Sequence, residues 1–266
     1  MILRFGYKSV VRNIFNLMHQ EHDFFKPPEN PDQKVWRYID TTKFLDLINS
    51  NSLFFTRTDL FEDVYEGSLT KKSVEARTKY YELLDQMTKT PTEYTPDFYN
   101  RYNQALKSEI ALNCWHMSDY ESAAMWKLYL KSNEGIAIQS TYSRLSSCFD
   151  ETEIPVFIGK VKYIDYDNHF IDLNNLLLPF VHKRRSFEHE KELRCLVWQN
   201  ARSEDAKFSL DTGGVKIEID LEMLVENIYI SPNTPAWFTI LINDIVKKYN
   251  LNLSVINSRL SQLPLF

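Results

Sequence analysis

The stretch FEHEKELRCLVW, residues 187–198, sets a run of charged side chains directly before an apolar run. Successive side chains of a β-strand point to opposite faces, so residues two apart share a face. Leu193, Cys195 and Val197 then form one apolar face. The other face begins with charges and continues apolar: Glu190, Glu192, Arg194, Leu196 and Trp198. Two carboxylates and a guanidinium on one side of a core strand predict the wall of a cleft.

The composition excludes several kinds of site. With 266 residues, 44% hydrophobic and 25% charged, the chain can bury a sizeable core. Its net charge of −5 argues against a generally basic, nucleic-acid-binding surface, although a local basic groove stays open. The 6 glycines do not cluster, which excludes a glycine-rich loop that cradles phosphates.

The chain reads as a cytoplasmic protein. Its three cysteines have no close pairing, which favours a reducing compartment. Charged and polar residues interrupt the N-terminal apolar residues, so no signal peptide is expected. No stretch approaches the roughly 18 apolar residues of a membrane span, and we expect no membrane partner.

The pattern of elements predicts a mixed α+β fold with a mostly antiparallel sheet. Residues 1–34 read as an amphipathic helix and a linker, and residues 35–266 as a single α+β domain with a helical insertion at about 67–110. Thr41 or Thr42 is expected to cap the helix over 41–50. A helix over 118–135 is expected, with Ser118 and Glu121 as its capping box, and a polar helix between 171 and 187.

Each unusual cluster has a structural interpretation beside a functional one. Arg37-Tyr38 lies within a strand, where an arginine is either solvated at an edge or faces a cleft. The stripe of Met125, Trp126 and Tyr129 at helical spacing is more often core than a cofactor site. Glu190 and Glu192, taken alone, favour an ion network with three basic residues: Lys183, Arg184 and Arg194.

A metal site has weak support from the sequence. Glu62, Asp63 and Glu66 place three carboxylates in five residues, but without the spacing of a calcium loop. His182 and His189 have no Cys or His companions at ligand spacing, so no zinc is expected.

The order of these pieces resembles a bacterial family, Domain of Unknown Function 2971. The series is WRYID, SLFF, FEDVYEG, NCWHMS, MWKLY, GIAI and FEHEKELR, over roughly residues 35–260. Trp115 stands where that family has phenylalanine, and Phe187 where it has tryptophan. The family name itself implies no function.

More distantly, the chain is similar to ADP-ribosyltransferases. NCWHMSDYESAAMWKLY looks like a strand followed by a serine-bearing helix, and EKELRCLV like the strand that opens with a catalytic glutamate. This resemblance implies NAD as substrate. It assigns Glu192 to stabilise the ribosyl cation, Glu190 to orient or deprotonate the acceptor, and Tyr129 or Trp126 to stack on nicotinamide. Further contacts to NAD are implied for four residues: Arg37, Tyr38, Ser118 and Arg194.

The same resemblance implies a toxin or antiphage effector with an antitoxin or defence-system partner, and an acceptor that is protein or nucleic acid. Two alternatives remain: a non-catalytic module that binds a nucleotide or partner, and a metal-dependent hydrolase or nuclease that uses the acidic cluster. In the transferase reading Glu192 faces the cleft, so Glu192→Gln should change stability by less than about 1 kcal/mol.

Overall fold

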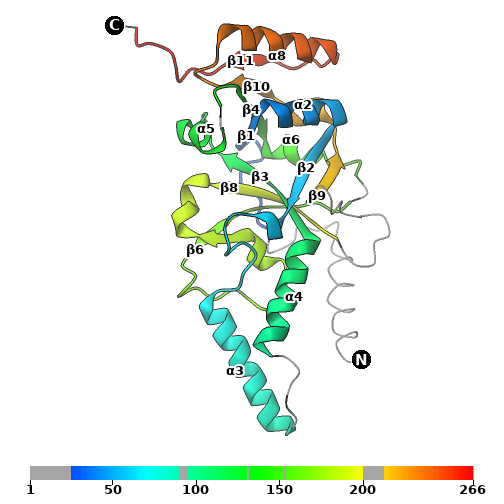
Figure 1. Cartoon of the computed structure of the whole chain (residues 1–266), viewed down its shortest axis with the longest axis vertical. Helices are drawn as coiled ribbons and strands as arrows, with labels where there is room; N and C mark the ends of the chain where they lie inside the picture. Colours follow the sequence, from blue (N-terminus) through cyan, green and yellow to red (C-terminus); the bar gives the residue numbers. More distant parts are fainter. Residues whose placement is uncertain are drawn as a thin grey trace.

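A nine-stranded, mostly antiparallel sheet forms the centre of the protein (Figure 1). The computed structural model describes residues 25–89, 91, 95–130, 132–152, 154–199 and 213–265, so the helix predicted near the N-terminus lies outside them. The strands of this sheet are β1 (Lys34–Asp40), β2 (Ser52–Arg57), β3 (Ile110–Met117), β4 (Gly135–Thr141), β5 (Phe157–Lys160), β8 (Glu192–Trp198), β9 (Gly214–Glu218), β10 (Asn227–Ile230) and β11 (Val255–Asn257). β6 (Lys162–Ile164) and β7 (His182–Arg184) form a separate parallel pair.

The sheet divides at β3. One edge of β3 pairs with β8 along its length, from Ile110 opposite Trp198 to His116 opposite Glu192. Its other edge is shared, with β1 at the end near His116 and β2 at the end near Leu112. From this point one arm runs through β1, β4, β10 and β11, and the other through β2 and β9.

Side chains tie each arm to β3 where strand pairing stops. The Arg37 Nη1 donates to the carbonyl oxygen of Cys114 at 2.8 Å. The Asn113 amide donates to the carbonyl oxygen of Phe54 at 2.9 Å and accepts from the Trp115 indole at 2.7 Å. The bonds to the two carbonyl oxygens satisfy backbone groups that strand pairing leaves without a partner.

The helices cover the sheet and form the predicted insertion. They are α2 (Thr41–Ser50), α3 (Lys71–Thr88), α4 (Pro96–Glu109), α5 (Ala123–Tyr129), α6 (Tyr142–Ser147), α7 (Leu221–Leu224) and α8 (Ala236–Lys248). Figure 1 shows α3 and α4 projecting together from the sheet between β2 and β3. The predicted α+β class, antiparallel sheet and helical insertion are therefore confirmed.

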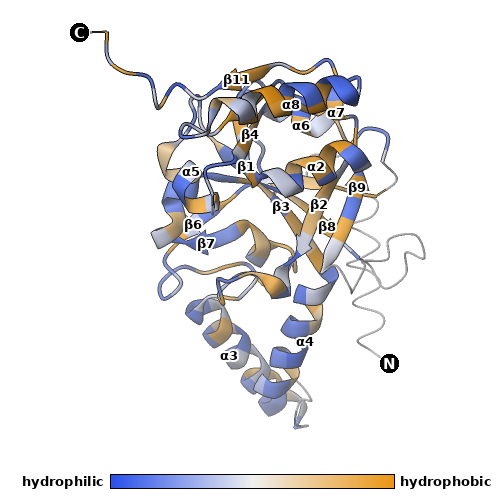
Figure 2. Ribbon diagram, turned by 45° about the horizontal axis from the view of Figure 1, so that its top comes forward, coloured by the Kyte–Doolittle hydropathy of each residue, from blue (hydrophilic) through white to orange (hydrophobic). Residues whose placement is uncertain are grey.

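The two largest of three buried apolar clusters in the described residues lie on opposite faces of the sheet. The larger includes Leu193, Cys195 and Val197 of β8, packed with side chains of α2, α6, α7 and α8. The second holds Leu196 of β8 with residues from α4 and from the short 3-10 helix η2 (Leu178–Val181). Figure 2 shows the hydrophobic colours gathered on the strands and the hydrophilic ones on α3 and α4. In the part of the chain that the structure describes, no helix is both long and apolar enough to cross a bilayer.

Three local predictions were wrong. Asp40, not Thr41 or Thr42, caps α2, because its carboxylate accepts from the Lys43 amide. The helix expected over 118–135 is only α5, capped by Ser122, and Gly135 already begins β4. The segment expected to hold a polar helix before residue 187 forms instead two 3-10 turns and β7, because its apolar residues are drawn into the second core.

Candidate functional site

Strand pairing sets Glu192 and Arg194 on one face of β8. His116 and Cys114 of β3 lie directly opposite them, so these side chains share that face. Leu193, between the two charged residues, turns into the larger core and is fully buried. The alternation predicted for β8 is confirmed on both faces.

Arg194 is the centre of a buried set of charges. Its side chain is 0% exposed, and all of its contacts are short. The Nε donates to Glu192 Oε2 at 2.6 Å, the Nη2 to Glu66 Oε2 at 2.9 Å, and the Nη1 to the carbonyl oxygen of Phe180 at 2.7 Å. A guanidinium removed from water is tolerable only with such complete pairing.

Lys183 extends this set to a second carboxylate. Its Nζ donates to Glu190 Oε2 and to Glu192 Oε1, each at 2.6 Å. Burial lowers the pKa of Lys183, but the charge of Glu192 and hydrogen bonds to both carboxylates outweigh it and leave the pKa raised. We call the five residues the β8 charge network: Glu66, Lys183, Glu190, Glu192 and Arg194.

The two glutamates of the network differ in pKa. Burial raises the pKa of Glu190 to about 7, and its contact with Glu192 adds to the effect. Burial also disfavours the charged form of Glu192, but the charges of Arg194 and Lys183 prevail and hold its pKa below the ordinary value. The two carboxyl groups therefore titrate as a pair, in which the cations favour the ionised form of Glu192 over that of Glu190.

Tyr129 and Arg37 stand beside this pair. Burial raises the pKa of the Tyr129 hydroxyl, and the charges of Glu190 and Glu192 raise it further, while Arg37 opposes them. The Tyr129 side chain at the end of α5 is still half exposed. Among the described residues no Asp or Glu forms an ion pair with Arg37, whose Nη1 donates to the Cys114 carbonyl oxygen.

Three other residues predicted to contact NAD have packing or capping contacts. The Tyr38 hydroxyl accepts from the Ser122 amide at 2.7 Å, which fixes the start of α5. Trp126 is 3% exposed and packs edge-on against Tyr38, so neither of its faces is open. Ser118 follows the end of β3, where its hydroxyl accepts from the Tyr120 amide at 3.3 Å.

Sequence reasoning missed two residues next to the pair. The His116 Nδ1 lies 2.6 Å from the carbonyl oxygen of Glu190, and burial lowers the pKa of that imidazole. The Tyr163 hydroxyl accepts from the Glu192 amide at 2.8 Å. The alternation of β3 could have indicated His116, because it shares a face with Cys114, but no local pattern links Tyr163 to β8.

The environment of Glu192 corrects one expectation. Glu192 is 4% exposed and held between Lys183 and Arg194, so it does not face open solvent in a cleft. Its replacement by glutamine would leave two buried cations with less compensation, so the predicted stability change of under about 1 kcal/mol is too small. The ion network that the sequence offered as an alternative is present for Lys183 and Arg194, whereas Arg184 pairs with Asp63.

The acidic residues considered for a metal are also separated. Arg194 stands between Glu66 and Glu192, and Asp63 is paired with Arg184, so both carboxylates already have a cationic partner. The described residues contain no group of three or more His, Cys, Asp or Glu side chains arranged to hold a metal ion.

Comparisons with known proteins return only structural likenesses. No family model and no curated protein matches the sequence, so the resemblance to Domain of Unknown Function 2971 is not confirmed. The chain is similar to Thermus sp. 2.9 DarT in complex with NAD+, at a TM-score of 0.40 and 8% identity over 87% of this chain and 97% of that one. It is also similar to the same protein in complex with ADP-ribosylated ssDNA, at 0.39 and 8%, over 88% and 98%. With TM-scores below 0.5 the likeness is distant and carries no argument about function.

Proposed function

We propose that this protein is an ADP-ribosyltransferase-like enzyme that cleaves the nicotinamide–ribose bond of NAD and transfers ADP-ribose to an acceptor. The observation that carries the proposal is the adjacent pair Glu190 and Glu192, which both accept from the Lys183 ammonium at 2.6 Å, while Glu192 also accepts from Arg194 at 2.6 Å. This unequal pairing with cations favours the ionised form of Glu192 over that of Glu190, and two carboxyl groups with pKa values pushed apart provide the separate roles that bond cleavage and transfer require. The proposal includes the fold: the sheet is of the ADP-ribosyltransferase type, and the glutamate pair lies beside β3, where the sheet divides.

The chemistry assigns a role to each glutamate. Cleavage of the nicotinamide–ribose bond passes through an oxocarbenium-like cation, as glycoside hydrolysis does. Glu192, kept ionised by Arg194 and Lys183, supplies the negative charge that stabilises this cation. Glu190, which holds a proton part of the time near pH 7, accepts the proton that the acceptor loses. In this proposal a ribose hydroxyl takes over the hydrogen bond of Lys183 to Glu192, and Arg194 alone then keeps that carboxylate ionised.

Two further residues fit the rest of NAD. The Tyr129 ring is half exposed beside the glutamates and is placed to stack on the cationic nicotinamide ring. Arg37, with no carboxylate partner in the described part of the chain, is available to a pyrophosphate oxygen. Trp126 is buried in its own cluster, so Tyr129 is the stacking residue of this proposal.

The metal-dependent hydrolase is less well supported, because four of the five carboxylates it would use already contact arginine or lysine: Asp63, Glu66, Glu190 and Glu192. A non-catalytic nucleotide-binding module remains the second candidate, since the same contacts would bind NAD without cleaving it. A toxin or antiphage role, an antitoxin partner and the nature of the acceptor are predictions from the resemblance alone, and a cytoplasmic location is a prediction from the unpaired cysteines.

Release of nicotinamide from NAD by the purified chain, in EDTA, tests the proposal. We expect turnover that survives chelation and falls about 10²-fold or more in Glu190→Gln when acceptor is present. The matched control is Glu188→Gln, an exposed carboxylate two residues away that has no place in the network. NAD binding without release supports the binding module, and activity that requires added Mg²⁺ supports the hydrolase. Either result refutes the transferase.

A further inference from the structure

The turn that joins the two glutamates has an unusual main-chain conformation. Lys191, which lies between Glu190 and Glu192, has a φ of 42°, in the left-handed region that residues other than glycine rarely adopt. It ends the 3-10 helix η3 (Arg185–Glu190), and β8 begins at the next residue. Such a conformation persists only where the surrounding structure holds it, so the contacts of this turn decide where the two carboxyl groups point.

The end of β3 holds the first half of the turn. The His116 Nδ1 lies 2.6 Å from the carbonyl oxygen of Glu190, and because a carbonyl oxygen only accepts, this nitrogen carries the hydrogen of the bond. The next residue of β3, Met117, donates its amide to the carbonyl oxygen of Lys191 at 2.9 Å. His116 is 8% exposed, so its bond to Glu190 is shielded from water.

The β6–β7 pair holds the second half. Tyr163 of β6 lies opposite Lys183 of β7, so their side chains share a face of that pair. The Tyr163 hydroxyl accepts from the Glu192 amide at 2.8 Å, and Lys183 donates to the Glu192 carboxylate at 2.6 Å. The carbonyl oxygen of Glu192 accepts from the Val161 amide at 2.9 Å. The same short ribbon therefore fixes both the main chain and the side chain of Glu192.

We propose that His116 and Tyr163 are positioning residues, which hold the main chain on either side of Lys191 so that Glu190 and Glu192 act on one substrate. Both contact the main chain of the glutamates and not their carboxyl groups, so they act through the glutamates. What the glutamates do rests on the proposed function, but their arrangement is measurable without NAD. A displacement of about 1 Å at a reacting group can cost about 10²-fold in rate.

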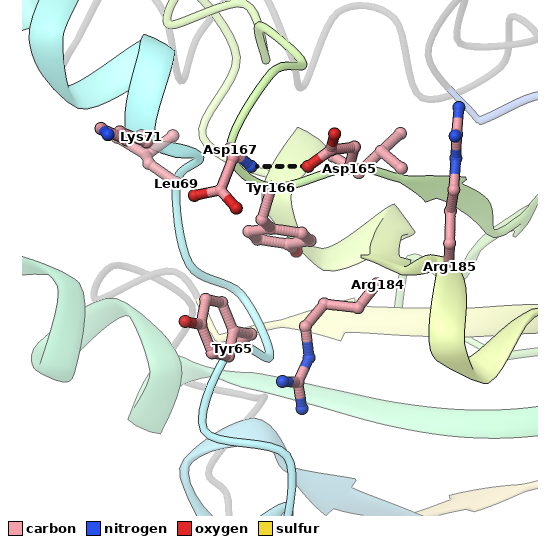
Figure 3. Close-up of a pocket in the computed structure, with 9 residues that line it drawn as sticks. Tyr65, Leu69, Lys71, Asp165, Tyr166, Asp167, Arg184 and Arg185 are labelled. Atoms are coloured by element: carbon pink, nitrogen blue, oxygen red, sulfur yellow. Dashed lines mark hydrogen bonds between the residues drawn. The ribbon is translucent and has the colours of Figure 1, made fainter.

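Each residue has a matched pair of variants. Tyr163→Phe removes one oxygen atom and leaves the Glu192 amide without its partner. Its control is Tyr166→Phe, because the Tyr166 hydroxyl also bonds to the main chain, donating to the His182 carbonyl oxygen at 3.3 Å. Figure 3 shows Tyr166 in the wall of a pocket of about 480 Å³, whose lining contains no residue of the turn. For His116, asparagine keeps an N–H donor close to the main chain, whereas leucine has none.

A carbon-13 NMR titration of the glutamate carboxyl groups, without NAD, gives the first readout. The midpoint of Glu190 should stay as in the wild type in Tyr166→Phe and His116→Asn. In Tyr163→Phe and His116→Leu it should fall toward the ordinary pKa of 4.5, because a loosened turn lets water reach the carboxyl group. Nicotinamide release gives the second readout: kcat should fall about tenfold or more in those same two variants, with KM little changed.

The opposite results are equally clear. Equal titrations and equal kcat in Tyr163→Phe and Tyr166→Phe would reduce Tyr163 to a packing residue and overturn its role. Equal behaviour of His116→Leu and His116→Asn would do the same for His116. Absence of nicotinamide release from the wild type would refute the proposed function and not the positioning, because the carboxyl titration still separates the variants.

Discussion

The two faces of β8 are both buried, yet they are buried by different means. Leu193, Cys195 and Val197 are removed from water by packing alone, which is favourable in itself. Glu192 and Arg194 are removed at a desolvation cost that their partners must offset. Residues adjacent in sequence therefore differ in what their loss does: on one face a cavity remains, on the other an unpaired charge.

Loss of Arg194 should have the largest effect. Arg194→Met fills much of the same volume but leaves Glu66 and Glu192 buried without their guanidinium partner. We expect the free energy of unfolding to fall by about 3–5 kcal/mol, measured by urea denaturation. If the double variant Glu66→Gln with Arg194→Met is no more stable than Arg194→Met, unpaired charge is not the cause.

Truncation on the apolar face should cost a comparable amount for another reason. Leu193 is fully buried in the larger core, so Leu193→Ala leaves a cavity. We expect a loss of about 2–5 kcal/mol, which should be nearly independent of pH and salt. A strongly salt-dependent loss would mean that the substitution disturbs the charged face as well.

Glu192→Gln should cost less than either. In this variant Lys183 still pairs with Glu190, and Arg194 still pairs with Glu66. The glutamine oxygen also still accepts one of the hydrogen bonds that Glu192 accepted. We expect a loss of about 1–3 kcal/mol, measured by the same denaturation. A change below about 0.5 kcal/mol, the usual limit for surface positions, would show that the side chain is in effect solvated.

The smallest effect should be the pH dependence contributed by Glu190. Its pKa is about 7 in the folded chain against an ordinary value of 4.5, so folding takes up a proton between these values. The free energy of unfolding should therefore fall as pH rises from about 4.5 to 7 and then level off. Glu190→Gln should lose this slope and Glu188→Gln should keep it. Parallel curves for wild type and Glu190→Gln would contradict the raised pKa.

Local patterns in the sequence were enough to predict β8, its two faces and the helical insertion, because strand alternation and turn residues act over short range. The expected helix over 118–135 failed for tertiary reasons. Glu121 does not cap it, since its carboxylate accepts from the Trp126 indole at 3.0 Å and from the Ser258 hydroxyl at 2.6 Å.

The site itself depends on contacts between distant segments. Arg194 contacts Glu66, which is 128 positions away in the sequence. The point where β1 separates from β3 depends on the order of the strands in the sheet, which no local sequence pattern indicates. The sequence singled out Glu190, Glu192 and Tyr129, which do lie near one another. It could not distinguish Tyr129 from the buried Trp126, because both fit the same helical stripe.

The most direct test compares Glu192→Gln and Leu193→Ala by nicotinamide release, at a temperature where melting curves show both variants folded. These neighbours face opposite sides of β8, so equal amounts of folded protein isolate the charged face from the packed one. The account predicts a loss of about 10²-fold or more for Glu192→Gln with NAD affinity little changed, and activity close to wild type for Leu193→Ala. Full turnover in folded Glu192→Gln would contradict it and leave the β8 charge network with a purely structural role.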